Sequence, residues 1–263
     1  MRSPLRRSFF IVPFSFLLLS LQVVTPAQPP AFSVVEASIS DMQEAMQQGR
    51  ITSRGIVQQY LNRIAKYEER LNAIIALNPR ALDDAEARDR ERSQGKVRGP
   101  LHGIPIALKD NIHTIDMPTT GGALAFKGFV PPYEATLTKN LRDAGAIILA
   151  KTNMTELANW IATGMPGNYN ALVGYGFNPY DARPDPRDDT NDGRPALNAG
   201  GSSSGAGTAA NLWAANVGTE TSGSILTPAN QTMLAGIKPT VGRISRYGII
   251  PITADQDTAG PMA

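Results

Sequence analysis

Ile104-Pro-Ile-Ala-Leu-Lys109 is a short apolar run that ends in a lysine, and Ala146-Ile-Ile-Leu-Ala150 is a second apolar run of the same kind. Short, continuous apolar runs between turn residues are typical of strands that are buried on both faces. Segments with helical patterns surround these runs, at residues 52–64, 79–93 and 136–144. This alternation predicts an α/β fold in which helices cover both faces of a sheet.

Two helices that precede the first run are predicted from their capping residues. Ser40 and Gln43 form a capping box, and Gly49 ends that short helix. Thr52 or Ser53 caps the next helix. The apolar residues of this second helix fall on one face: Ile56, Val57, Tyr60, Leu61 and Ile64. Such a face is expected to be buried.

The rest of the chain has weaker patterns. Residues 154–161 and 208–215 are predicted to be helical, and residues 248–252 are predicted to form a strand. Residues 164–199 are rich in Gly, Pro, Asn and Asp, which predicts a long surface loop. Residues 255–263 have the pattern of an unfinished connection, so we expect the chain to be truncated at its C-terminal end.

The N-terminal segment has the organisation of a signal peptide. Three arginines within the first seven residues precede a mostly apolar stretch at residues 9–24, and small residues surround Ala27. Residues 1–27 are therefore expected to be a signal peptide, and residues 28–263 one domain. This predicts a secreted or exported protein. An uncleaved N-terminus that anchors the protein in a membrane is the alternative.

Composition excludes several classes of function. The 263 residues carry a formal net charge of only +2, which argues against a nucleic-acid partner. The absence of cysteine excludes a thiol nucleophile, a zinc–cysteine site and disulfides. No Lys-Ser or Lys-Thr pair follows the glycine-rich loop at 200–207 at the spacing of a phosphate-binding loop. We expect neither a metal nor a cofactor.

Three segments carry residues suited to catalysis. Lys109 ends a buried strand, and burial lowers the proton affinity of a lysine, so that it can act as a base. Gly200-Gly-Ser-Ser-Ser-Gly-Ala-Gly207 points several hydroxyls and N–H groups at one place. Ser224 follows a turn of small residues whose N–H groups can form an oxyanion hole. A nucleophile elbow centred on Ser203 is an alternative that needs a histidine later in the chain, and both histidines come earlier.

Together and in this order, these segments resemble the amidase signature family. The matching segments are 101–111, 146–156, 200–207, 218–225 and 236–242, and the Gly-Gly-Ser-Ser-Ser-Gly core is the hallmark of the family. Leu101-His-Gly-Ile-Pro-Ile and Ser245-Arg-Tyr-Gly-Ile-Ile-Pro-Ile are similar to peptide amidases and their exported relatives. The resemblance implies a mixed sheet covered by helices on both faces, with a further C-terminal part after residue 263.

The resemblance also implies a Ser–cis-Ser–Lys triad. Lys109 corresponds to the base of the family, Ser202 to a bridging serine that follows a cis peptide bond, and Ser224 to the nucleophile. The oxyanion hole would be formed by backbone N–H groups at Thr221, Ser222, Gly223 and Ser224. The implied reaction is hydrolysis of a small carboxylic amide or a peptide amide through an acyl-enzyme.

This chain departs from the family pattern at two places. The interval from Ser202 to Ser224 is two residues shorter than is usual in the family, and Ser222 stands where the family commonly has glycine. Two other functions stay open. One is an amidotransferase A-type subunit, which uses the same triad to release ammonia for a partner. The other is an inactive amidase homologue that acts as a binding protein. The sequence leaves the oligomeric state open.

Overall fold

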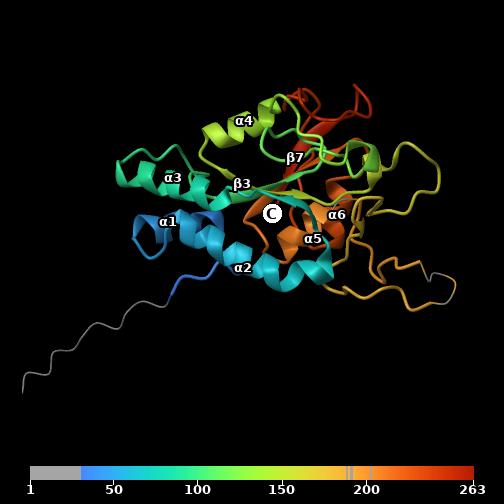
Figure 1. Cartoon of the computed structure of the whole chain (residues 1–263), viewed down its shortest axis with the longest axis horizontal. Coiled ribbons are helices and arrows are strands. Elements are labelled where there is room, and N and C mark those ends of the chain that lie inside the picture. Colours follow the sequence, from blue (N-terminus) through green and yellow to red (C-terminus); the bar gives the residue numbers. More distant parts are fainter. Residues whose placement is uncertain (1–30, 188, 190–191, 202) are drawn as a thin grey trace, which may run out of the picture. The chain divides into compact units, whose positions relative to one another are not determined.

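The computed structural model describes residues 31–187, 189, 192–201 and 203–263, and a mixed sheet lies at the centre of the unit Phe32–Ala263 (Figure 1). The predicted signal peptide at 1–27 lies outside the described residues. Within the described ranges, no helix combines the length and the apolar character needed to cross a bilayer.

The central sheet has five strands in the order β1-β3-β2-β6-β7. Strand β2 is parallel to both of its neighbours, β3 and β6, whereas the edge strands β1 and β7 are antiparallel to theirs. The strands are β1 (Ile74–Leu77), β2 (Pro105–Lys109), β3 (Ile147–Thr152), β6 (Ala215–Glu220) and β7 (Thr258–Met262). This arrangement confirms the predicted mixed α/β sheet.

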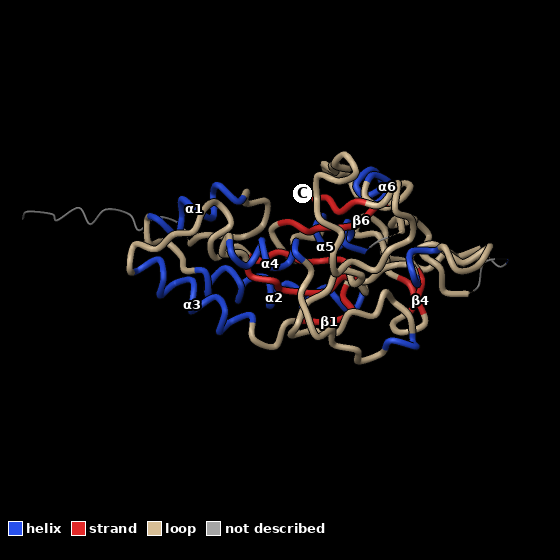
Figure 2. Tube along the Cα trace, turned by 90° about the horizontal axis from the view of Figure 1, so that it is seen from above, coloured by secondary structure: helices blue, strands red, loops and turns tan. Residues whose placement is uncertain are grey.

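Helices lie on both sides of this sheet. In Figure 1, α2 and α5 lie below the strands and α4 lies above them, and Figure 2 shows the same elements from above. The helices are α1 (Ile39–Gln47), α2 (Ser53–Leu71), α3 (Ala81–Ser93), α4 (Thr136–Asp143), α5 (Ser203–Ala209) and α6 (Leu226–Gln231). Two short 3₁₀ helices, η1 (Leu124–Phe126) and η2 (Glu156–Asn159), and a small hairpin of β4 (Tyr169–Asn170) and β5 (Gly174–Tyr175) complete the described elements.

The main core forms where the apolar runs of the sequence meet. Every residue of β2 and β3 is buried, as their continuous apolar character predicts. Thr52 caps α2 through its side chain, which accepts a hydrogen bond from the Gly55 backbone. The predicted apolar face of α2 is buried except at Leu61, which is half-buried.

The capping box of α1 lies two residues before its predicted position. Ser38 is the N-cap, and its side chain and that of Asp41 bond each other's backbone N–H groups. Gln43 instead donates from its side chain to the backbone oxygens of Pro100 and His102. The Gln43 side chain, which was predicted to cap the helix, therefore makes a tertiary contact instead.

The predicted helices at 154–161 and 208–215 were wrong. Only a 3₁₀ turn forms in the first segment, because Leu157 and Ala158 have positive φ angles of 40° and 58°. The second helix, α5, lies earlier and ends at Ala209, and β6 begins at Ala215. Glycines allow this placement, since a Cβ on Gly205 would lie 2.9 Å from the hydroxyl of Thr232.

The predicted strand at 248–252 was also wrong, and the last strand lies where an unfinished connection was expected. In the described structure, 248–252 makes one isolated bridge, between Ile249 and Ile112. Residues 258–262 form β7, which pairs with β6 along its whole length. Pro261 fits this position because proline is tolerated on edge strands.

The described residues of 164–199 follow an irregular course apart from the β4–β5 hairpin, and this segment was predicted as a loop. Three of its asparagines are nevertheless fully buried: Asn168, Asn170 and Asn178. Asn178, for example, donates to the backbone oxygens of Asn198 and Gln231. Side-chain amides thus replace the strand ladders that this segment lacks.

Candidate active site

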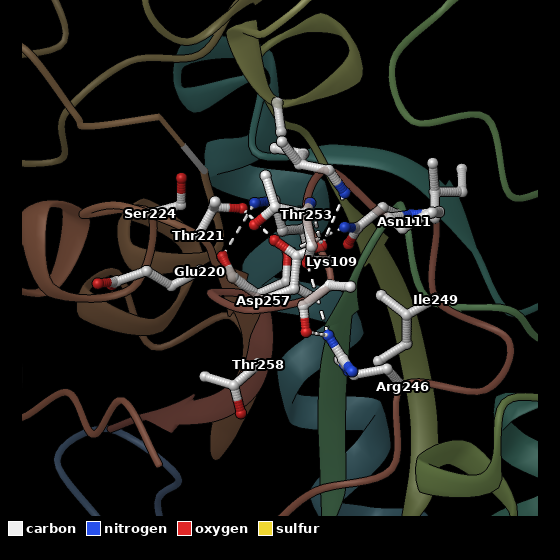
Figure 3. Close-up of a pocket in the computed structure, with 16 residues that line it drawn as sticks. Lys109, Asn111, Glu220, Thr221, Ser224, Arg246, Ile249, Thr253, Asp257 and Thr258 are labelled. Carbon is white, nitrogen blue, oxygen red and sulfur yellow. Dashed lines mark hydrogen bonds between the residues drawn. The ribbon is translucent and has the colours of Figure 1, made fainter. Parts of the chain in front are cut away.

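A cavity of about 260 Å³ lies at the carboxyl ends of β2 and β6 (Figure 3). Lys109 and Asn111 contribute to it from the end of β2, and the segment 219–221 with Ser224 contributes from the end of β6. The loop 249–254 forms the facing wall. Ligand sites in α/β sheets commonly lie at the carboxyl ends of parallel strands, so this is the expected place for catalysis.

Lys109 is fully buried at the end of β2. Its Nζ donates to the carbonyl oxygen of Thr219 over 3.2 Å. Burial lowers the pKa of this lysine from 10.5 to about 8, while the carboxylates of Glu220 and Asp257 act in the opposite direction. The neutral amine is therefore available close to neutral pH, which a general base requires.

Ser224 is half-buried in the turn between β6 and α6, and it lines the same cavity as Lys109 (Figure 3). Thr221, at the start of this turn, also lines the cavity, whereas the side chain of Ser222 is exposed. The structure thus brings two of the three predicted triad residues to one cavity. Of the four predicted oxyanion donors, Thr221 and Ser224 line the cavity, whereas the backbone N–H of Gly223 acts on the Glu220 carboxylate.

Glu220 holds the far end of this turn. Its Oε2 accepts hydrogen bonds from the backbone N–H groups of Ile225 and Leu226, at 2.8 and 2.9 Å. Its Oε1 lies 3.6 Å from the Nζ of Lys238. Burial alone would raise the pKa of this carboxyl, but backbone N–H groups of the turn and the Lys238 ammonium outweigh burial and hold the pKa below its usual value. The ionised form of Glu220 is therefore favoured beneath the turn.

The backbone conformation explains one departure from the family pattern, Ser222 in place of glycine. Gly223 has a φ of +85°, in the left-handed region, and a Cβ there would lie 2.8 Å from the hydroxyl of Thr227. Ser222 is not among the residues with positive φ. Position 222 therefore does not require glycine, whereas position 223 does.

The interval from Ser202 to Ser224, which carries the other departure, contains a tight turn. The chain leaves α5 at Ala209 and enters β6 at Ala215, through a turn in which Asn211 has a φ of +53°. Strand β6 pairs with β2 from its first residue, Ala215 opposite Ile106. Trp213 fills the turn, and its indole N–H donates to the Thr208 hydroxyl over 2.7 Å.

Ser202 and the peptide bond before it lie outside the described residues. Their neighbours pack beside the Ser224 turn. Gly200 has a φ of +82°, and a Cβ there would lie 2.7 Å from the Cα of Pro228 in α6. The carbonyl oxygen of Gly201 accepts a hydrogen bond from the Thr155 backbone over 3.2 Å. Gly200 is thus held against α6, the helix that follows Ser224.

Sequence reasoning missed several residues of this site. Asn111 donates from its side chain to the Thr219 hydroxyl over 2.9 Å, and Asp257 accepts a hydrogen bond from the Thr221 hydroxyl. Asn111 directly follows the Lys109-Asp110 pair, so its place after a strand was a usable signal. Asp257 had none, because no pattern in its segment predicts β7.

The sequence profile of the family described as Amidase matches residues 55–263. The chain belongs to the amidase family. This membership confirms the resemblance that was inferred from the motifs. A probable amidase of Arabidopsis thaliana is 42% identical over 236 residues, covering 88% of this chain and 44% of that protein.

Solved structures and other relatives agree with this placement. The structure of native peptide amidase from Stenotrophomonas maltophilia matches with a TM-score of 0.80 and 46% identity, covering 87% of this chain and 45% of that one. The A-type subunit of the glutamyl-tRNA(Gln) amidotransferase of Rhodopirellula baltica is 38% identical, covering 86% of this chain and 42% of that protein. The amidase-family chain described here therefore spans less than half the length of these relatives.

Proposed function

We propose that this protein hydrolyses a carboxylic amide through an acyl-enzyme on Ser224, with Lys109 as the base and Ser202 as the bridge between them. One observation carries the proposal. A fully buried lysine, whose pKa is lowered to about 8, lines the same cavity as a serine that follows a glycine turn. A neutral amine beside a serine and backbone donors is suited to acyl transfer.

The proposed reaction has two halves. The Ser224 hydroxyl attacks the amide carbonyl, its proton passes to the Ser202 oxygen, and the Ser202 proton passes to the Lys109 amine. Backbone N–H groups at 221–224 stabilise the negative oxygen of the tetrahedral intermediate. The carbon–nitrogen bond then breaks, and the relay returns a proton to the leaving nitrogen. Water hydrolyses the acyl-enzyme by the same steps.

The proposed substrate is a small amide or a peptide with a C-terminal amide, which releases ammonia. The similarity to peptide amidase supports this class. The facing wall of the cavity supports it too, because Ile249, Ile250, Pro251 and Ile252 offer an apolar surface to an acyl side chain. We further propose that residues 1–27 direct the protein out of the cytoplasm.

Ammonia release from an N-acetylated dipeptide amide tests the proposal on the full chain. Ser224→Ala and Lys109→Ala are each expected to abolish it. Ser93→Ala and Lys96→Ala are matched controls, because this serine and lysine are close in the sequence, exposed on the surface and outside the cavity. Turnover by Ser224→Ala close to that of the wild type would refute the assignment.

A fluorophosphonate probe separates the proposed enzyme from an inactive binding protein. The wild type is expected to gain one adduct on Ser224 by mass spectrometry, and Ser224→Ala none. No adduct on the wild type would favour a binding protein without catalysis. Similarity to the A-type subunit of an amidotransferase keeps a second candidate in view. It would be favoured if the labelled protein released ammonia from amides only after a partner was added.

A further inference from the structure

Asp257 connects two walls of the candidate active site. It is half-buried just before β7 and lines the cavity. Its Oδ1 accepts a hydrogen bond from the Thr221 hydroxyl. Its Oδ2 accepts from the backbone N–H groups of Ile252 and Thr253, at 2.7 and 3.0 Å. One carboxylate therefore joins the turn that carries Ser224 to the loop on the opposite side of the cavity.

On the first wall, Thr221 is held from two directions. Its hydroxyl reaches Asp257, and its carbonyl oxygen accepts a hydrogen bond from the Nζ of Lys238 over 2.7 Å. Glu220 holds the other end of the turn through the backbone of Ile225 and Leu226. With both ends held, the N–H groups between them have a fixed direction, which an oxyanion hole requires.

On the second wall, Asn111, Asp257 and Arg246 all anchor the loop 249–254 through hydrogen bonds. The backbone N–H of Ile250 donates to the carbonyl oxygen of Asn111 over 2.9 Å. Two residues after Ile250, the backbone N–H groups of Ile252 and Thr253 donate hydrogen bonds to the Asp257 carboxylate. Hydrogen bonds that involve a charged group are stronger than neutral ones, so Asp257 is a stronger anchor than the Asn111 backbone, and the Arg246 guanidinium, which donates to the carbonyl oxygen of Ala254, is a second charged anchor.

We infer that Asp257 is a positioning residue for amide hydrolysis: by joining Thr221 to the backbone of Ile252 and Thr253, it fixes the separation of the Ser224 turn from the opposite wall. This inference rests on the proposed function. The role is indirect, because Asp257 acts through Thr221 and through the loop. Displacing reacting groups by about 1 Å lowers turnover by about a hundredfold, so a residue that sets this separation affects kcat.

Steady-state kinetics of the full chain test the inference. Asp257→Asn cannot accept hydrogen bonds on both sides, because its amide nitrogen is a donor. We expect kcat to fall on the order of tenfold to a hundredfold, with a smaller change in KM. Thr221→Val should lower kcat less, since the loop keeps its anchor, and Thr221→Ser, which keeps the hydroxyl, should lower kcat less than Thr221→Val does. Asp255→Asn is the matched control, because Asp255 is exposed nearby and does not line the cavity.

A double-mutant cycle tests whether Asp257 acts through Thr221. If it does, Thr221→Val combined with Asp257→Asn is no slower than Asp257→Asn alone. If the fold-losses in kcat of the two single variants multiply in the double variant, the two residues act independently, and the inference is overturned. Unchanged kcat in Asp257→Asn would overturn it as well.

The pH profile of kcat/KM separates the positioning effect of Asp257 from the effect of its charge on Lys109. Lys109 faces two carboxylates, Glu220 from β6 and Asp257 from the segment before β7, and the guanidinium of Arg246 lines the same cavity. Removing the Asp257 charge should move the low-pH limb of kcat/KM to lower pH, because one anion that favours the Lys109 ammonium is lost. Thr221→Val keeps that charge and should leave the limb in place. A fall in kcat in Thr221→Val with the limb unmoved therefore reports position alone.

Hydrogen–deuterium exchange gives a readout that does not depend on activity. Asp257→Asn should speed exchange in peptides covering both 221–226 and 249–254, and Thr221→Val only in the first. Equal exchange in Asp257→Asn and the wild type would overturn the inference. Failure of the proposed function looks different, because the wild type would then not be labelled at Ser224. That result would also remove any catalytic role for Asp257.

Discussion

Lys109 and Asp110 are neighbours in the chain, but their side chains lie on opposite faces of the sheet. The Nζ of Lys109 donates to Thr219 in the cavity, whereas Asp110 Oδ1 lies 3.3 Å from the Nζ of Lys151 in β3. Successive residues of a strand point to opposite faces, so the carboxylate next to the proposed base does not hold it protonated. Asp110 is not among the groups that shift the pKa of Lys109.

The Lys151–Asp110 pair is fully buried, so losing one partner should be more harmful than losing both. Lys151→Met leaves the Asp110 carboxylate without its cation and is expected to destabilise the protein by about 3–5 kcal/mol. Adding Asp110→Asn should recover part of that loss. Chemical denaturation measures both. Lys127→Met is the control, because this lysine is exposed. A single variant no less stable than the double would contradict this view of the pair.

The pH dependence of hydrolysis should follow the deprotonation of Lys109. The lysine must be neutral to accept a proton, and burial lowers its pKa to about 8. We therefore expect kcat/KM to rise with pH, with a midpoint near 8. Below this pH the ammonium form predominates and activity falls. A profile that is flat from pH 6 to about 9 would show that another group is the base.

Protein stability offers a second measure of the same lysine. Below pH about 8, Lys109 is protonated in both the folded and the unfolded state. Burying the charged ammonium then destabilises the folded state. Between about 8 and 10.5 only the unfolded state binds the proton, so this group makes stability rise with pH. Lys109→Met removes the effect. The free energy of unfolding of the wild type minus that of Lys109→Met should therefore increase across this window.

The sequence was sufficient for the parts of the fold that depend on local pattern. Strands β2 and β3 are continuous apolar runs buried on both faces, and the α2 face follows the helical period, so each could be recognised in isolation. Strand β7 could not be recognised. Its Thr-Ala-Gly-Pro-Met sequence has weak strand propensity, and it forms because β6 supplies a ladder of hydrogen bonds.

The site was predictable where one residue type carries the chemistry. Lys109 and Ser224 follow recognisable motifs, and both line the cavity. Asp257 and the loop 249–254 line it too. The motif at 245–252 supported the resemblance, but no local pattern places the loop or Asp257 at the cavity, because they reach it only through the tertiary path of the chain. Ser202 lies outside the described residues, and its role as the bridge stays a prediction.

Gly207 allows the tight turn between α5 and β6, so an added methyl group there should destabilise the protein. A Cβ on Gly207 would lie 2.1 Å from the ring of Trp213, which is buried. Overpacking of this kind destabilises by about 1–3 kcal/mol, so Gly207→Ala should lower the melting temperature. Gly167→Ala is the matched control, because nothing lies within 4 Å of its Cβ position. Equal melting temperatures for the two variants would show that Trp213 can move aside without loss.

Alanine at Gly223 should lower kcat strongly, whereas alanine at Ser222 should not. Gly223 has a φ of +85°, and its Cβ position lies 2.8 Å from the Thr227 hydroxyl, so Gly223→Ala must distort the turn. Because loss of one oxyanion donor lowers kcat about 10²–10³-fold, we expect a fall of roughly a hundredfold. Ser222 is exposed, lacks a positive φ and would act through its backbone, so Ser222→Ala should retain kcat within about twofold.

Fluorophosphonate labelling rates, measured beside kcat, show whether the turn still presents Ser224. An equal loss in both variants would mean that the Ser222 side chain itself takes part in the reaction.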